Sequence, residues 1–62
     1  MNATEQALRA IKDRVAGALG VIEETAPDAA RKENYNRLMQ TARDLHRCAD
    51  EMQNILMRVR PR

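Results

Sequence analysis

The spacing of apolar residues in the second half of the chain limits its fold more than any other feature. Apolar residues, including alanine, recur there at alternating intervals of three and four without a polar exception: Tyr35, Leu38, Ala42, Leu45, Ala49, Met52, Leu56 and Val59. This heptad spacing is typical of an α-helix that buries one stripe against other helices. The first half repeats it with Leu8, Ile11, Val15, Ala18 and Ile22. No segment alternates with the period of a strand, so the sequence predicts an all-α chain.

Proline at position 27 divides this pattern into two helices. Proline disfavours helical dihedrals at the preceding residue but is accepted in the first turn of a helix. We therefore expect one helix over about 3–25 and a second over about 28–60, ended by Pro61. Asn2 and Glu5 have the spacing of a capping box at the start of the first helix. The prediction is a single antiparallel helical-hairpin domain over 1–62, whose basic end at 58–62 can fray.

The chain is too short to be stabilised easily by its own core. It has 62 residues, and a hydrophobic fraction of 44% that includes many alanines. Chains of this size usually need a disulfide, a metal or a partner chain. One cysteine cannot form an internal disulfide, and one histidine with one cysteine cannot complete a structural zinc site. A second copy of the chain is the remaining means of stabilising the fold, and we predict a homodimeric four-helix bundle.

The unequal lengths of the predicted helices indicate where the second copy would bind. If the chain turns at Ala26–Pro27, the first helix ends opposite about Ala49, and the rest of the second helix projects beyond it. Apolar side chains on such an overhang would have no partner within the chain. The predicted oligomer or partner interface therefore comprises Leu45, Ala49, Met52, Ile55, Leu56 and Val59.

Charge and composition exclude several classes of function. The formal net charge is +2, and opposite charges four residues apart, as in Glu5–Arg9, Glu33–Arg37 and Arg47–Glu51, are typical of solvated helix faces. We expect no enzyme, cofactor, metal or small-molecule substrate. No apolar run is long enough to cross a membrane, and a single free thiol suits the cytoplasm. Frequent arginine and alanine suggest a bacterial or phage genome.

Three single residues and one pair of glycines each allow two interpretations. His46 is expected at the boundary of a helical seam, and only a second chain could make it a metal ligand. Cys48 is a small, half-buried side chain or an intermolecular disulfide. Tyr35 closes the loop end of the bundle or anchors a partner. Gly17, with Gly20, is a tolerated mid-helix residue or allows close helix packing.

The segment LHRCADEM at 45–52 resembles the second helix of the Rop-type plasmid copy-number regulators. Leu45, His46, Ala49 and the adjacent acidic pair at 50–51 carry the resemblance, with Met52 in place of leucine. Ala42, Leu45, Ala49 and Met52 also repeat that helix's alternation of small and large core residues. The resemblance implies a homodimeric helical hairpin that binds RNA. The first helix has no phenylalanine, so it does not reproduce the RNA-contacting face.

We expect a small protein-binding module, an adaptor or inhibitor that acts as an oligomer by occupying a partner surface. One alternative is a Rop-like RNA-binding regulator that uses the basic face of the second helix. A further alternative is a hairpin similar to the secretion co-chaperones. The side chains expected to contact a protein or nucleic acid are Arg43, Arg47, Met57, Arg58 and Arg60.

Overall fold

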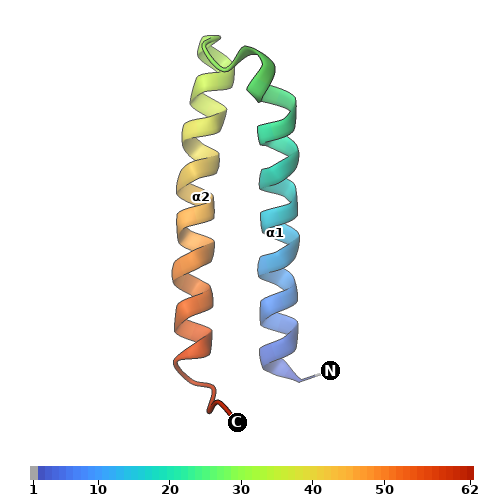
Figure 1. The fold of residues 1–62 in the computed structure, drawn as a ribbon, viewed down its shortest axis with the longest axis vertical. Helices are drawn as coiled ribbons and strands as arrows, with labels where there is room; N and C mark the ends of the chain where they lie inside the picture. The colour runs from blue at the N-terminus through green and yellow to red at the C-terminus, as the bar shows by residue number, and fades with distance from the viewer. Residues whose placement is uncertain (1) are drawn as a thin grey trace.

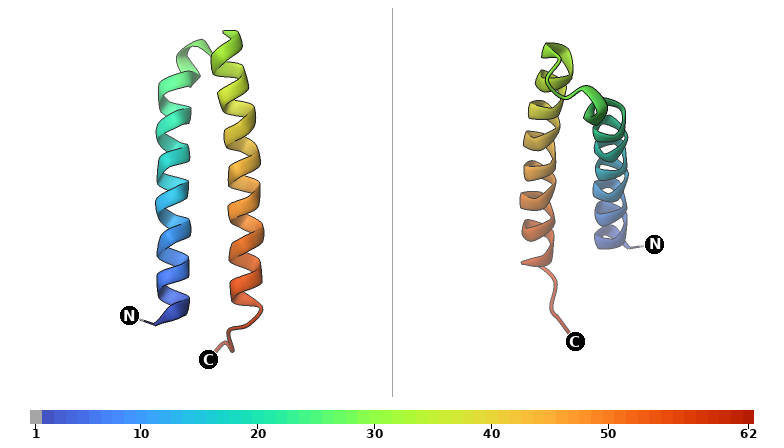
Figure 2. Two further views of the ribbon diagram at one scale, coloured as in Figure 1. Left: turned by 180° about the vertical axis from the view of Figure 1, so that it is seen from behind. Right: turned by 45° about the horizontal axis from the view of Figure 1, so that its top comes forward.

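The computed structural model describes residues 2–62, which form two antiparallel helices lying side by side (Figures 1 and 2). Helix α1 spans Ala3–Thr25, a 3-10 turn η1 spans Ala26–Asp28, and helix α2 spans Lys32–Leu56. The hairpin measures 46 × 19 × 15 Å, and both ends of the chain lie at the end opposite the turn. The described residues include no strand. The predicted all-α helical hairpin is confirmed.

Helix α1 begins as the sequence predicts. The side chain of Asn2 accepts a hydrogen bond from the Glu5 backbone N–H at 2.7 Å, which satisfies one of the unpaired amides of the first turn. The Glu5 carboxylate pairs with Arg9 at 3.1 Å, one turn further on. Asn2 is therefore an N-cap, while Glu5 contributes an ion pair on the helix surface.

Helix α2 is shorter at both ends than predicted. Pro27 does not start it; Pro27 lies within η1, and the chain crosses to the second helix through residues 29–31. The Asp28 carbonyl accepts the Arg31 N–H at 3.3 Å and the Asn34 side-chain amide at 3.0 Å. These bonds close the turn before Arg31, whose backbone is extended, and α2 follows. At its other end α2 stops at Leu56, so 57–62 lie outside the helix.

The longer turn corrects the predicted alignment of the two helices. Ion pairs join Arg14 to Glu51 and Glu24 to Arg37, which sets the last turn of α2 beside the first turns of α1. Ile55 is half-buried beside alanines of α1 and does not project past them. The predicted overhang of Met52, Ile55, Leu56 and Val59 is therefore wrong: α1 reaches as far as α2 does.

The contact between the helices follows a second heptad series on α2, one residue before the predicted stripe. Its members, spaced by seven, are Asn34, Thr41, Cys48 and Ile55, all buried or half-buried. Opposite them on α1 lie Ile11, Ala18 and Thr25, which are buried. The Thr25 hydroxyl is fully buried and donates to the Val21 carbonyl at 2.7 Å. The enclosed seam is thus narrow and built mainly from small side chains.

The glycines of α1 do not mark a close approach of the helices. A Cβ atom added at Gly17 or Gly20 would meet no neighbouring atom within 4 Å. Both residues have ordinary helical backbone, without positive φ. Of the two interpretations, the structure supports tolerated mid-helix glycine, because neither position needs the missing side chain.

Candidate interaction surface

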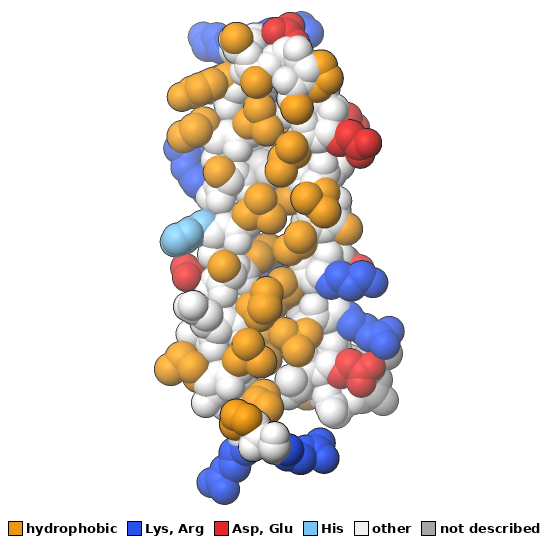
Figure 3. All heavy atoms as spheres, in the orientation of Figure 1, with side chains coloured by type: hydrophobic (Ala, Val, Ile, Leu, Met, Phe, Trp, Pro, Cys, Tyr) orange, Lys and Arg blue, Asp and Glu red, His pale blue; other side chains and the backbone are white. Residues whose placement is uncertain are grey.

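A continuous apolar surface runs along one side of the hairpin over both helices (Figure 3). We call it the apolar face. Its α2 residues are those of the predicted heptad stripe, namely Tyr35, Leu38, Ala42, Leu45, Ala49, Met52, Leu56 and, just beyond the helix, Val59; its α1 residues are Leu8, Val15, Leu19 and Ile22. All are exposed or half-buried. The strongest apolar pattern in the sequence is therefore uncovered in the single chain.

Helix geometry explains why this stripe remains outside the hairpin contact. Thr41 and Cys48 point at α1, and Ala42 and Ala49, one residue later, lie about 100° around the helix. Asp44, three residues after Thr41, lies on the other side of the seam. One neighbouring helix can cover only part of a stripe this wide. The outer positions of α2 need a second neighbour to be buried.

Large side chains on the apolar face are substantially open to solvent. Leu19, Tyr35 and Leu56 are 58%, 56% and 51% exposed, whereas Ile11 in the seam is 5% exposed. The chain's accessible surface is 5210 Å², while a compact monomer of 7.1 kDa would expose about 4,100 Å². A contiguous apolar surface on this scale is typical of a protein-interaction site.

The opposite side, which we call the polar face, is closed by charged side chains. It comprises Arg14, Asp44, Arg47, Glu51, Asn54 and Arg58, which line shallow grooves along the seam. The Arg14 guanidinium donates to the Glu51 carboxylate across the seam, and this hydrogen bond raises the pKa of Arg14. Arg47 pairs with Asp44 at 3.7 Å. Both faces flank the same seam, but charges bridge only the polar one.

Acidic and basic groups border the apolar face (Figure 3). Along α1, from the open end to the turn, helical position places Glu5, Arg9, Lys12 and Glu23 beside the face. Along α2, Asp50 and Arg43 occupy the corresponding border, with His46 between them. An apolar centre with a polar rim is the usual anatomy of a protein–protein interface.

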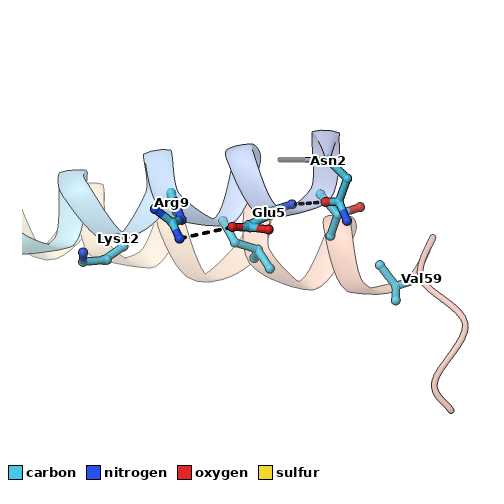
Figure 4. A pocket seen from close by; sticks show the side chains of 7 residues that line it. Asn2, Glu5, Arg9, Lys12 and Val59 are labelled. Carbon is cyan, nitrogen blue, oxygen red and sulfur yellow. Dashed lines mark hydrogen bonds and ion pairs between the residues drawn. The ribbon is translucent and has the colours of Figure 1, made fainter.

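The open end of the apolar face is hollowed into a groove (Figure 4). Leu8 and Val59 form its apolar part, and Glu5, Arg9 and Lys12 stand along one side. In Figure 4 the Glu5–Arg9 pair and the Asn2–Glu5 cap lie together along α1, with Val59 on the chain that leaves α2. The groove extends the apolar face to the hairpin's open end.

The predicted interface residues divide between the face and the seam. Leu45 is half-buried at the boundary, while Ala49, Met52, Leu56 and Val59 are exposed on the apolar face. Ile55 belongs to the seam. The α1 contribution, above all Leu19, is absent from the predicted interface. Leu19 lies four residues after Val15 and one turn before Glu23, a spacing that marks it as apolar but does not show whether a neighbour covers it.

The predicted contact residues lie in two parts of the hairpin, the middle of α2 and its C-terminal end. Arg43 borders the apolar face, and Arg47 pairs with Asp44 on the polar face. Arg58 lies on the polar face beside the first turn of α1, and Arg60 follows it in the non-helical end. Met57 is 81% exposed just after α2. Arg43 and Arg47, four residues apart, are neighbours on the surface of α2, whereas Met57, Arg58 and Arg60 lie at its C-terminal end.

Three of the residues with two interpretations occupy distinct environments. His46 is exposed, with its Nε2 3.9 Å from the Asp50 carboxylate, and Cys48 is buried, so the two side chains point apart. Burial of Cys48 against α1 fits a packing role. Tyr35 does not close the loop end of the single hairpin, because it stands exposed on the apolar face.

No protein-family model, curated protein or solved structure matches the chain. The Rop resemblance therefore stays a prediction. Within residues 2–62, no cluster of three or more histidine, cysteine, aspartate or glutamate side chains is arranged to hold a metal ion. Neither described helix combines the length and apolar character that crossing a membrane requires.

Proposed function

We propose that the protein is a small, non-enzymatic protein-binding module that acts through its apolar face as an oligomer. The observation that carries the proposal is the uncovered heptad stripe of α2, extended by Leu19 and its neighbours on α1. An apolar stripe of this length on a helix is usually buried by contact with other helices, either in a bundle or in a complex where a helix binds a groove. An adaptor or inhibitor that occupies a helical surface of its partner fits this architecture.

The same apolar face would serve a second copy and a different protein. Under this proposal two hairpins bury their apolar faces against each other in a homodimeric four-helix bundle. A partner with a matching helical surface then competes with the second copy for the apolar face. We place this activity in the cytoplasm of bacteria or of phage-infected cells, in keeping with a single thiol that is not part of a disulfide.

Competitive capture with matched variants tests the proposed function. Wild type, Leu19→Asp and Asn54→Asp would be used to retain proteins from a nuclease-treated bacterial lysate, with washes at about 0.05 and about 0.5 M salt. Leu19→Asp places a charge on the apolar face, whereas Asn54→Asp places the same charge on the polar face. We expect wild type and Asn54→Asp to retain the same protein at both salt concentrations, and Leu19→Asp to lose it.

A retained protein would then be purified and titrated against the three variants to establish direct binding. Two results would contradict the proposal. One is retention that Leu19→Asp does not alter. The other is recovery of nucleic acid alone from untreated lysate with steep loss between low and moderate salt, which would indicate binding through phosphate contacts.

A further inference from the structure

We propose that a second copy of the chain covers the apolar face with its turn at the same end as the turn of the first. This inference deepens the proposed function and rests on its claim that the apolar face is a binding surface. It adds the identity of one occupant, the direction in which that occupant lies, and the charge pairs that hold it there.

The surface area of the hairpin suits one additional copy. Its accessible surface of 5210 Å² exceeds that of a compact monomer of equal mass by on the order of 1,000 Å². A standard interface removes about 800 Å² from each partner. One twofold contact between two apolar faces would therefore remove most of the excess, and the result is a four-helix bundle.

Two twofold arrangements can bring the apolar faces together. With the turns at the same end, α1 of each copy lies beside α2 of the other, and residues at one height remain at that height. With the turns at opposite ends, α1 lies beside α1 and α2 beside α2, each reversed. Neighbouring helices are antiparallel in both arrangements, so helix dipoles do not choose between them.

The border charges favour the arrangement with both turns at the same end. There, the α1 border faces the partner's α2 border, which sets Lys12 against Asp50 and Glu23 against Arg43. Figure 3 shows acidic and basic groups along both borders. Side chains lean toward the N-terminus of their own helix, so Glu23 leans to the open end and Arg43 to the turn, which brings the two groups closer in height.

With the turns at opposite ends, the α1 border of one copy faces the α1 border of the other copy, running in the opposite direction. Glu23 near the turn would then face Glu5 near the open end twice in the dimer, and the pairing of Glu5 with Arg9 at 3.1 Å would offset only part of this like-charge contact. Like-charge juxtaposition selects against an arrangement more strongly than a favourable rim pair selects for one. The two borders are thus complementary in one arrangement and partly repulsive in the other.

Side-chain size agrees with the charges. Leu19 is the most exposed large apolar side chain of α1, and Ala42 lies at a similar height on α2. With the turns at the same end, Leu19 of one copy faces Ala42 of the other, and the small alanine leaves room for the leucine side chain to pack. With the turns at opposite ends, Leu19 would face the charged Arg9.

Intermolecular distances between spin labels test the arrangement directly. The label would be attached to Ala29→Cys in the turn, in full-length chain carrying Cys48→Ala. We expect the labels to lie roughly 15–25 Å apart, the width of a four-helix bundle whose axes are about 8–10 Å apart. A separation on the order of 40 Å, the length of a helix of this size, would overturn the arrangement and leave the proposed binding surface intact.

The control label is Arg47→Cys, near the middle of α2 and on the polar face. Its separation is similar in both arrangements, so it reports association without reporting direction. If neither label gives an intermolecular distance at high micromolar concentration, the hairpin does not self-associate, and that result overturns this inference together with the oligomeric part of the proposed function.

A charge exchange gives an independent readout. Glu23→Arg should raise the dimer dissociation constant by about 3- to 10-fold, because two rim pairs are lost per dimer. Adding Arg43→Glu in the same chain should restore the wild-type value, since both pairs re-form with reversed sign. Absence of that rescue, in a double variant with wild-type helical content, would contradict the assigned pairs.

Discussion

The two faces of the hairpin are built from the same helices but differ in what completes them. On the polar face, Arg14 and Glu51 bridge the seam, and Arg47 pairs with Asp44. On the apolar face, Leu19 and Leu56 extend into solvent. On the polar face, charged side chains of the same chain pair with each other, whereas the large side chains of the apolar face are left open to solvent. Under the proposal above, folding of the hairpin and its assembly would use separate surfaces.

Truncating the seam should have the largest effect, because both faces depend on it. Ile11 is 5% exposed and is the largest buried apolar side chain described. We expect Ile11→Ala to lower the free energy of unfolding by about 2–5 kcal/mol, a loss that a chain this small can hardly sustain. Thermal unfolding followed by circular dichroism measures it. A shift no larger than that of an exposed alanine substitution would contradict the assigned seam.

A charge at the centre of the apolar face should separate assembly from folding. Ala42 is exposed in the single hairpin, and glutamate is a good helix former, so Ala42→Glu should leave the helices intact. An uncompensated charge in a buried interface costs roughly 3–5 kcal/mol, which raises the dissociation constant roughly 100-fold or more. Sedimentation equilibrium measures the change.

The matched control for Ala42→Glu is Asn54→Glu on the polar face. It adds the same side chain to the same helix, and its dissociation constant should stay within about twofold of wild type. If both variants weaken association equally, the distinction between the two faces is wrong, and the effect of Ala42→Glu comes from net charge alone.

Filling the glycine position beside the polar groove should stabilise the hairpin without changing assembly. A Cβ at Gly17 meets nothing within 4 Å, and alanine is favoured over glycine inside a helix by roughly 0.5–1 kcal/mol. We expect Gly17→Ala to raise the free energy of unfolding by that amount and to leave the dissociation constant unchanged. Weaker association would mean that the polar side of α1 also contacts another chain.

Removing the ion pair across the polar face should have the smallest effect. The Arg14 and Glu51 side chains are nearly half exposed, and ion pairs open to solvent contribute little to stability. Arg14→Gln should lower stability only slightly, with the difference between variant and wild type shrinking as salt rises. A loss of stability as large as that of Ile11→Ala would show that the pair does more than align the helices.

The periodicity of apolar residues was sufficient to predict the two helices and their antiparallel arrangement. Heptad spacing places side chains on one stripe whatever the loop does, and Pro27 must interrupt an α-helix. The start of α1 was also predictable, because Asn2 has the side chain and the position of an N-cap. These features depend on local geometry, which a sequence shows directly.

The alignment of the helices was not predictable in the same way. It depends on whether residues 28–31 continue as helix or form a turn, and that depends on the bonds from Arg31 and Asn34 to the Asp28 carbonyl. A shift of a few residues removed the predicted overhang. The series Asn34, Thr41, Cys48 and Ile55 carries the missing signal, because its seven-residue spacing marks a second contact stripe that is less apolar than the first.

The central claim is that the apolar face is an assembly surface, and the mass of the protein in solution tests it most directly. Sedimentation equilibrium of the wild-type chain from low to high micromolar concentration should give a species of twice the chain mass of 7.1 kDa. Ala42→Glu should move the same sample toward the monomer. A wild-type chain that stays monomeric and fully helical across this range would contradict the account.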